Sequence, residues 1–314
     1  MRRKKMECAP KAALSDWVAA ARLPFTTVAL VPFLVGAFIA RSAGVAVNWA
    51  AVAAGLGVVL AITVACHLVG EASDVREDSY TLEYGRTKFS GGTLVAVEGR
   101  IPPARLRRAA WLVLACGAAL GAWIVLQWRS PLIAALGVFG ALCAVLYSMP
   151  PVRLAARGVG EIFIAVCYGW LTLAAGYACA AGTLDERSFL YSIPLALSIF
   201  NVIFINEFPD YLADKAAGKR NLVVRLGRER CAKIYGLTSL LLPLALVALW
   251  FRFRADSPLF LLAVLPAALL ALKLGRDVAL AGKWRDLSTL EPVCGQGILL
   301  DHITAVTIGV LLAA

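Results

Sequence analysis

Apolar runs of about twenty residues recur along nearly the whole chain, and each is long enough to cross the hydrocarbon core of a bilayer as a helix. Such runs fold as helices because a membrane core offers no water to unpaired backbone groups. The 314 residues are 61% hydrophobic and 16% charged, with mean hydropathy +0.78. We therefore predict an all-α polytopic membrane protein that forms a single domain over residues 1–314. About nine spans are expected, over residues 17–40, 49–70, 109–128, 132–149, 159–181, 189–208, 234–251, 258–274 and 294–313.

The formal charge of +11 follows the expected topology and does not indicate a nucleic-acid partner. With a cytoplasmic N-terminus, all but five of the 31 Lys and Arg residues lie on the cytoplasmic side. This positive-inside bias predicts an external C-terminus and a location in a bacterial-type cytoplasmic membrane. The eight Cys are scattered without a CxxC pair, which argues against a metal or disulfide framework. The five outward-facing cations are Arg41, Arg129, Arg187, Arg252 and Arg254.

A polar stripe follows the sixth apolar run. Asn206, Asp210 and Asp214 recur every four residues, so on a helix they share one face. Stacked carboxylates repel unless a cation lies between them, and Mg²⁺ binds carboxylates together with phosphate oxygens. Lys215 and Lys219 follow at once and offer charge to a phosphate. The alternative interpretation is a solvated, charged helix end at the membrane surface.

The longest polar interval, residues 71–108, carries a second acidic face. Glu71, Asp74 and Asp78 are spaced i, i+3 and i+7, which is one side of a helix. Arg86 and Lys88 follow, in a stretch whose hydroxyls and Gly-Gly pair offer further donors to an anion. A polar interval of this length is usually functional. We expect it to form a cytoplasmic acidic loop, on the same side as a second loop over residues 207–233.

Two charged residues lie at span ends. Arg22 begins the first span, where it either snorkels to the interface or contacts a substrate phosphate. Glu161 lies just inside the fifth span, where a carboxylate is costly unless it is paired or faces a wet cavity. Glu161 is therefore a candidate for lining a site.

A faint internal repeat relates the two acidic segments. The spacing of Gly70, Asp74 and Asp78 matches the spacing within Asn206–Asp214, four spans later. The repeat predicts two four-helix halves whose acidic segments meet over one central cavity, with a ninth helix added.

Over nearly its whole length the chain resembles the UbiA superfamily of membrane prenyltransferases. Asn206–Asp214 looks like the second Asp-rich motif of that family, and residues 216–227 continue in the family's style. Gly158–Phe163, with Gly176-Tyr177 beyond it, looks most like the branch that acts on 1,4-dihydroxy-2-naphthoate in menaquinone synthesis. The first motif departs from the family pattern, because Gly70-Glu71 stands where Asn-Asp is usual.

The resemblance implies Mg²⁺-dependent transfer of a prenyl group from a polyprenyl diphosphate to an aromatic acceptor, most closely 1,4-dihydroxy-2-naphthoate. It implies that Tyr147 and Glu161 orient the acceptor at the mouth of an apolar chamber. The implied metal ligands are Glu71, Asp74, Asp78, Asp210 and Asp214, of which the four aspartates are the catalytic groups. The implied diphosphate-binding residues are Arg22, Arg86, Lys88, Lys215, Lys219 and Asn206.

Other functions stay open at this point. The acceptor is alternatively 4-hydroxybenzoate or another lipid or quinone precursor, and the sequence leaves prenyl chain length and oligomeric state undetermined. A cation-coupled transporter is an interpretation of a different class. Transporters place their acidic residues near the bilayer midplane, whereas these lie at span ends beside basic residues. Metal-dependent release of diphosphate would distinguish the two.

Overall fold

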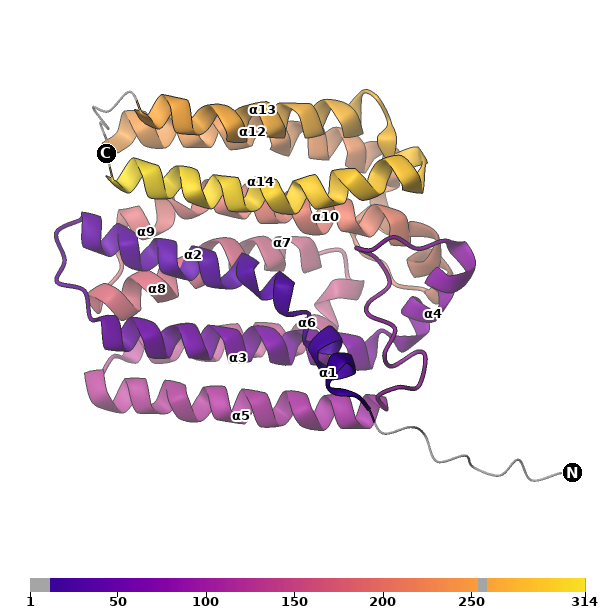
Figure 1. Ribbon diagram of the computed structural model, residues 1–314, viewed down its shortest axis with the longest axis horizontal. Coiled ribbons are helices and arrows are strands. Elements are labelled where there is room, and N and C mark those ends of the chain that lie inside the picture. The colour runs from indigo at the N-terminus through magenta and orange to yellow at the C-terminus, as the bar shows by residue number, and fades with distance from the viewer. Residues whose placement is uncertain (1–11, 254–258, 314) are drawn as a thin grey trace, which may run out of the picture.

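The computed structural model describes residues 12–253 and 259–313, and every regular element within those ranges is helical (Figure 1). The long helices run side by side, and α1 lies toward the opposite end of the bundle from the end of α14. The helices are α1 (Leu14–Ala21), α2 (Leu23–Ser42), α3 (Trp49–Ser73), α4 (Val75–Tyr84), α5 (Pro103–Trp128), α6 (Pro131–Ser148), η1 (Leu154–Ala156), α7 (Gly160–Ile164), η2 (Ala165–Leu171), α8 (Thr172–Ala181), α9 (Glu186–Leu190), α10 (Ser192–Ala217), α11 (Leu222–Leu226), α12 (Arg228–Phe253), α13 (Leu259–Ala279), η3 (Lys283–Arg285) and α14 (Leu287–Ala313).

The expectation of an all-α membrane protein is confirmed. Within the described ranges, eight helical stretches are long and apolar enough to cross a membrane. They coincide with eight of the expected spans, and α13 lies over the remaining one at residues 258–274. The count of nine is approximate, because α13 is not among the eight stretches that meet the criteria of length and apolar composition. The chain is therefore an integral membrane protein.

The helices of each half of the chain pack mainly on one another. α3 packs on α5 and α6 in the first half, and α10 packs on α12, which packs on α13, in the second. α14 lies against α10, α13 and α2. α2 and α8 approach so closely that a β-carbon at Gly176 would lie 1.8 Å from the Phe33 carbonyl oxygen. Small residues allow this approach, as is common between membrane helices.

The second acidic segment is helical to its end, unlike the expected loop over residues 207–233. α10 continues past the apolar run to Ala217 and ends at Gly218, which adopts the left-handed conformation typical of a helix terminus. Pro209 lies inside this extension and cannot donate to the carbonyl of Ile205. That carbonyl accepts instead from the Cys294 thiol at 3.8 Å. The extension places Asp210 and Asp214 on a rigid element.

The first acidic interval is also largely helical at its start. α3 ends at Ser73, and α4 begins at Val75 after a single intervening residue. Asp74 forms the joint, where its carbonyl accepts from the Asp78 amide at 2.8 Å. α4 packs against α10, and Figure 1 shows it toward the same end of the bundle as α1. The two acidic segments therefore meet, as the internal repeat predicts.

Candidate active site

The two acidic helices are joined by the Gly91-Gly92 turn. The Gly91 amide donates to Asp210 Oδ2 on α10 at 3.2 Å. On the other side, a β-carbon at Gly92 would lie 2.2 Å from Asp78 Oδ2. Both glycines have positive φ, 66° and 61°, in the region that side chains rarely adopt. This turn therefore holds Asp210 and Asp78 on its two sides.

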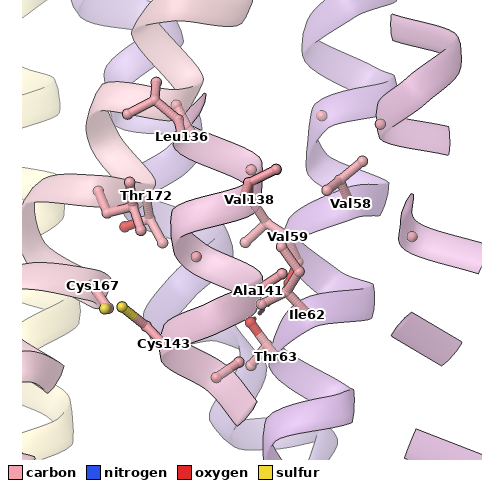
Figure 2. A pocket seen from close by; sticks show the side chains of 18 of the residues that line it. Val58, Val59, Ile62, Thr63, Leu136, Val138, Ala141, Cys143, Cys167 and Thr172 are labelled. Carbon is pink, nitrogen blue, oxygen red and sulfur yellow. Dashed lines mark hydrogen bonds between the residues drawn. The ribbon is translucent and has the colours of Figure 1, made fainter. Parts of the chain in front are cut away.

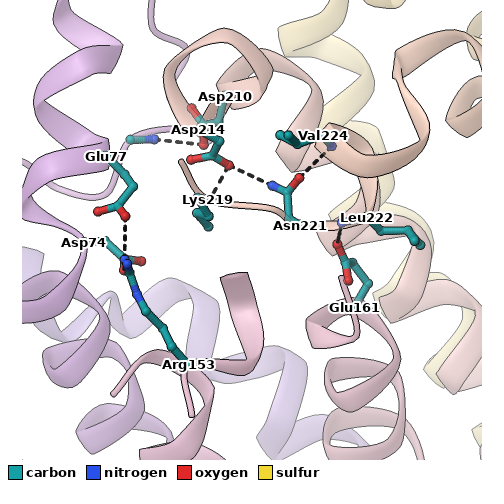
Figure 3. Close-up of polar contacts among 11 residues, drawn as sticks. Asp74, Glu77, Arg153, Glu161, Asp210, Asp214, Lys219, Asn221, Leu222 and Val224 are labelled. Carbon is teal, nitrogen blue, oxygen red and sulfur yellow. Dashed lines mark hydrogen bonds and ion pairs between the residues drawn. The ribbon is translucent and has the colours of Figure 1, made fainter. Parts of the chain in front are cut away.

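Asp214 is held by two partners from the segment after α10. Lys219 Nζ lies 3.4 Å from Asp214 Oδ2, and Asn221 Nδ2 donates to the same oxygen at 2.8 Å (Figure 3). Asn221 Oδ1 also accepts from the Val224 amide and so caps α11. The Gly218 turn and the cap thus fix Lys219 beside the acidic face.

Asp74 and Glu77 share one cation. Arg153 Nη2 lies 2.8 Å from Asp74 Oδ1 and 2.7 Å from Glu77 Oε1 (Figure 3). Arg153 belongs to the connection between α6 and α7, and it is 79 residues from Asp74 in the sequence. The connection after α6 therefore reaches the acidic end of the bundle.

Glu71 occupies a different position from the one expected of a metal ligand. Its two oxygens accept from the amides of Thr93 (2.9 Å) and Val95 (3.1 Å), and Arg22 Nη2 lies 3.5 Å from it. The residue is 2% exposed. Because both oxygens bind backbone amides, Glu71 anchors the loop that follows the glycine turn. Arg22 lies beside the acidic end.

The expected basic residues differ in where they point. Arg86 donates to the carbonyls of Gly91 (3.0 Å) and Gly92 (2.8 Å), so it clamps the turn. The Lys88 side chain is 84% exposed and lies 3.7 Å from Glu291. Lys215 lies over the Tyr211 ring, 5.7 Å from its centroid. Lys219 is the basic residue of this group that pairs directly with the acidic face of α10.

Negative charge is concentrated at this end of the bundle. The pKa of Asp78 is raised to about 8, because burial penalises its ionised form and the Asp74 carboxylate repels it. Burial opposes the charge of Lys219, but the carboxylates of Asp214 and Asp74 raise its pKa well above the ordinary value. Such a group of acids would be stabilised by an added cation.

The donor chemistry fits a hard divalent cation. Asp210 Oδ1 and Asn206 Oδ1 are buried without a hydrogen-bond partner, and they lie on one face of α10. In the described part of the chain, no three His, Cys, Asp or Glu side chains are already gathered closely enough to hold a metal ion. The oxygen donors present are those that Mg²⁺ prefers when it also binds phosphate oxygens.

Glu161 and Tyr147 lie near the ends of the helices that surround the apolar cavity, α7 and α6. Glu161 is fully buried, and one of its oxygens accepts from the Leu222 amide at the start of α11. Its second oxygen has no donor group beside it, and the same is true of one oxygen of Glu207, a buried neighbour whose carboxyl lies within hydrogen-bonding reach of Glu161. Tyr147, near the end of α6, lines an apolar cavity.

This cavity has a volume of about 640 Å³ and runs between α2, α3, α5, α6 and the α7–α8 stretch. Figure 2 shows apolar side chains of α3 and α6 on its wall, with Thr63, Thr172 and two cysteines among them. Along α3 the lining extends from Gly55 to Cys66, about 16 Å at the helical rise. Asp74 follows about two turns later. The acidic end therefore lies at one end of the cavity.

Four residues at the site were missed from the sequence: Glu77, Arg153, Asn221 and Glu207. Asn221 precedes a short helix and offers a cap signal that could have identified it. Arg153 and Glu207 have no such local signal, because their partners come from other helices.

Comparison with known proteins gives one family. A model of the UbiA prenyltransferase family matches residues 18–283. The chain is 34% identical over 100 residues to UbiA prenyltransferase domain-containing protein 1 of Dictyostelium discoideum, covering 32% of this chain and only 30% of that protein. It is 25% identical over 227 residues to a 2-carboxy-1,4-naphthoquinone phytyltransferase of Synechocystis sp., covering 71% and 69%. It is 26% identical over 224 residues to a 1,4-dihydroxy-2-naphthoate octaprenyltransferase of Mycobacterium tuberculosis, covering 71% and 74%.

Solved structures share the fold. One match comes from structural work on digeranylgeranylglyceryl phosphate synthase in membranes. It has a TM-score of 0.66 at 15% sequence identity, and the match covers 95% of this chain and 98% of that one. A homologue from Archaeoglobus fulgidus, bound to DMAPP and Mg²⁺, matches with TM-score 0.62 at 18% identity, covering 94% and 99%. At these identities the likeness shows the fold alone.

Proposed function

This chain belongs to the UbiA prenyltransferase family, and we propose that it transfers a prenyl group from a polyprenyl diphosphate to 1,4-dihydroxy-2-naphthoate. The observation that supports this most is the meeting of two acid-bearing helices at one end of an apolar cavity of about 640 Å³. A polyprenyl diphosphate likewise has a charged part and an apolar part, which are its diphosphate head and its long tail. A transporter lacks such support, since these acids lie at helix ends.

The head of the substrate would bind at the acidic end. Asp74, Asp78, Asp210 and Asp214 would hold magnesium against the diphosphate, with the Asn206 amide offering an oxygen to the ion or a nitrogen to the phosphate. Magnesium bound there would neutralise charge that develops on the leaving group. The homologue from Archaeoglobus fulgidus, with its bound DMAPP and Mg²⁺, supports this assignment.

Cations of this chain would share that task. Lys219 lies beside Asp214, Arg153 beside Asp74, and Arg22 beside Glu71. Positive groups that are fixed before the reaction stabilise a departing anion at little cost of reorganisation. Arg86 contributes indirectly by clamping the glycine turn.

The tail would lie in the cavity. Its lining is almost wholly apolar, and two lining residues, Leu126 and Val138, are 77% and 60% exposed. The cavity therefore reaches the lipid-facing surface, so a tail longer than the cavity can extend into the bilayer. When the carbon–oxygen bond to diphosphate breaks, this environment keeps water from the allylic cation.

The acceptor ring would attack that cation from the mouth of the cavity. Tyr147 lines the mouth, and the neighbouring carboxyls of Glu161 and Glu207, each with one oxygen that faces no donor group, offer acceptors for ring hydroxyls. Two hydroxyls make a naphthoate strongly nucleophilic, which suits a chain with few ionisable groups inside its spans. Attack at the carboxylate-bearing carbon is followed by loss of carbon dioxide. The naphthoquinone and naphthoate relatives support this acceptor over 4-hydroxybenzoate.

Product analysis tests the proposal. Purified protein is given a polyprenyl diphosphate with 1,4-dihydroxy-2-naphthoate or with 4-hydroxybenzoate, and products are identified by mass. We expect prenylated naphthoquinol and magnesium-dependent release of diphosphate. Prenylated 4-hydroxybenzoate alone would overturn the acceptor but leave prenyl transfer intact. No product and no diphosphate release with any acceptor would overturn the mechanism.

The charge asymmetry supports a cytoplasmic site in a bacterial-type inner membrane. A tag after Ala314 should be inaccessible from the cytoplasm and accessible from outside in sealed cells. A cytoplasmic tag there would contradict the orientation.

A further inference from the structure

A cluster of aromatic rings and cations lies outside the site described above, where α10, α12 and η3 come together. We call it the Trp284 cluster, and its members are Tyr211, Lys215, Arg228, Trp284 and Arg285. The Arg228 guanidinium lies 5.0 Å from the Tyr211 ring centroid and 5.4 Å from that of Trp284. Arg285 lies 4.9 Å from the Trp284 centroid, and Lys215 lies 5.7 Å from that of Tyr211. The two rings thus hold three cations in one place.

The cluster has a rigid base. Trp284 makes an edge-to-face contact with Phe208, with centroids 6.2 Å apart, and Phe208 is fully buried. A guanidinium that stacks on a ring keeps its N–H groups in the plane of the fork, free to donate to a planar or tetrahedral anion. The positions of Arg228 and Arg285 are therefore set before any ligand arrives.

No protein anion neutralises these cations in the described ranges 12–253 and 259–313. The side chains of Arg228 and Arg285 form no salt bridge and donate no hydrogen bond within those ranges, and Lys215 forms no salt bridge there. Neighbouring cations differ, since Lys273 and Lys283 lie 3.0 Å and 2.8 Å from the buried Asp277. Three close cations without a carboxylate repel one another, and an anion bound between them would remove that repulsion.

The cluster is separate from the acidic site. Tyr211 follows Asp210 on α10, so its side chain points about 100° away around the helix. Asp210 faces the Gly91 amide on the α4 side, whereas Tyr211 faces Arg228 at the start of α12. Lys215 follows Tyr211 by one helical turn and shares its direction. This explains why Lys215, expected to bind the substrate diphosphate, lies over an aromatic ring.

The position of the cluster favours a lipid. It lies where membrane-spanning helices α10, α12 and α14 begin or end, the level at which Trp and Tyr meet lipid headgroups. Leu280, at the end of the adjacent α13, is 81% exposed, and Leu212, next to Tyr211, is 44% exposed. Exposed leucines beside cations suit a ligand with a charged head and acyl chains.

We propose that the Trp284 cluster is a binding site for the phosphate headgroup of an anionic phospholipid. The guanidinium groups of Arg228 and Arg285 donate to the phosphate oxygens, and Lys215 adds charge. The acyl chains lie along the adjacent apolar surface. The site is independent of the prenyl-transfer reaction.

Lipid retention measured by native mass spectrometry tests the site in a neutral detergent, where diffuse attraction to a charged membrane is absent. The protein is incubated with equal amounts of phosphatidylglycerol and phosphatidylcholine. We expect preferential retention of phosphatidylglycerol, weakened about tenfold by Arg285→Gln and further by Arg228→Gln/Arg285→Gln, the size of a lost charge-assisted hydrogen bond. Arg285 is exposed, so the single variant keeps the test valid if the double variant folds poorly.

The matched control is Arg230→Gln/Lys233→Gln, which removes two cations from the same helix, away from the aromatic rings. The side chain of Lys233 is 74% exposed and 4.0 Å from Glu229. This control should retain phosphatidylglycerol as the unaltered protein does. Equal loss in both double variants, or no preference for phosphatidylglycerol in the unaltered protein, would overturn the proposal. Displacement of the lipid by millimolar inorganic pyrophosphate would show a site for soluble phosphate instead.

Discussion

Gly92→Ala should inactivate the enzyme through Asp78, because the glycine turn leaves no room for a side chain. The added β-carbon would lie 2.2 Å from Asp78 Oδ2 and 3.0 Å from Glu71 Oε2. The turn itself cannot move away easily. Arg86 donates to the carbonyls of Gly91 and Gly92, and the Gly91 amide is bound to Asp210. The Asp78 carboxylate is therefore the group that has to shift.

The size of the effect follows from that geometry. Ordinary van der Waals contact requires the Asp78 oxygen to retreat by about 1 Å, and a displacement of that size at a reacting centre costs about 10²-fold in rate. The positive φ of 61° adds a folding cost of about 1–2 kcal/mol for any residue other than glycine. The variant should therefore lose much activity and a little stability.

Gly99→Ala separates the two effects. Gly99 has a similar φ of 71°, but a β-carbon there would meet nothing within 4 Å. Initial rates of prenyl transfer at saturating magnesium and substrate, with thermal unfolding in detergent, compare the two variants. Both should lose similar stability, whereas Gly99→Ala should keep its rate within about threefold. A nearly unaltered rate in Gly92→Ala, or an equal loss in Gly99→Ala, would refute the role of the turn.

Three further predictions follow from the same site. Asp210→Asn and Asp74→Asn should each lower kcat by about 10²–10³-fold while the protein stays folded, because the amide keeps the size but loses the charge that attracts magnesium. Unaltered rates in both variants, or rates insensitive to excess chelator, would contradict the role of these aspartates in binding magnesium. The magnesium affinity of the substrate-free protein, measured by calorimetry, should fall as the pH decreases through about 8, the raised pKa of Asp78, because only the ionised carboxyl binds metal. If Asp78→Asn shows the same pH dependence, the titrating group is not Asp78. Gly70→Asn should raise KM for the acceptor with magnesium affinity unaltered within about twofold, and the reverse pattern would place Gly70 on the metal side.

The membrane fold could be predicted because span length and apolar composition are local properties of the sequence. Helix ends were less predictable. The hydropathy signal of the sixth span ends near residue 208, but α10 continues to Ala217. Ala213 and Asp214 are buried in this extension, and α4 packs against α10. Tertiary packing, which composition does not reveal, therefore decides where α10 ends.

The acidic faces could be predicted from four-residue spacing, since a helix fixes which residues share a side. Their partners could not. Arg153 pairs with Asp74 across 79 residues of sequence. Arg86 has the charge expected of a phosphate ligand, yet its donors are used by two carbonyls of the turn beside it. The residue type determines which interactions a side chain can make, and the fold decides which partner it contacts.

Gly70 shows how the structure changes the meaning of a departure from the family pattern. On sequence alone, glycine in place of the usual Asn removes a polar group next to an expected metal ligand. In the structure, a β-carbon at Gly70 would lie 3.5 Å from Ser148 Oγ, which is ordinary contact, so crowding does not require glycine. Gly70 also follows Cys66, a cavity-lining residue, by one helical turn of α3 and so shares its face. The side chain that is absent at residue 70 would therefore point towards the cavity mouth, where the acceptor is proposed to bind. The room left there bears on which ring can enter, whereas the magnesium donors of α4 and α10 keep their positions.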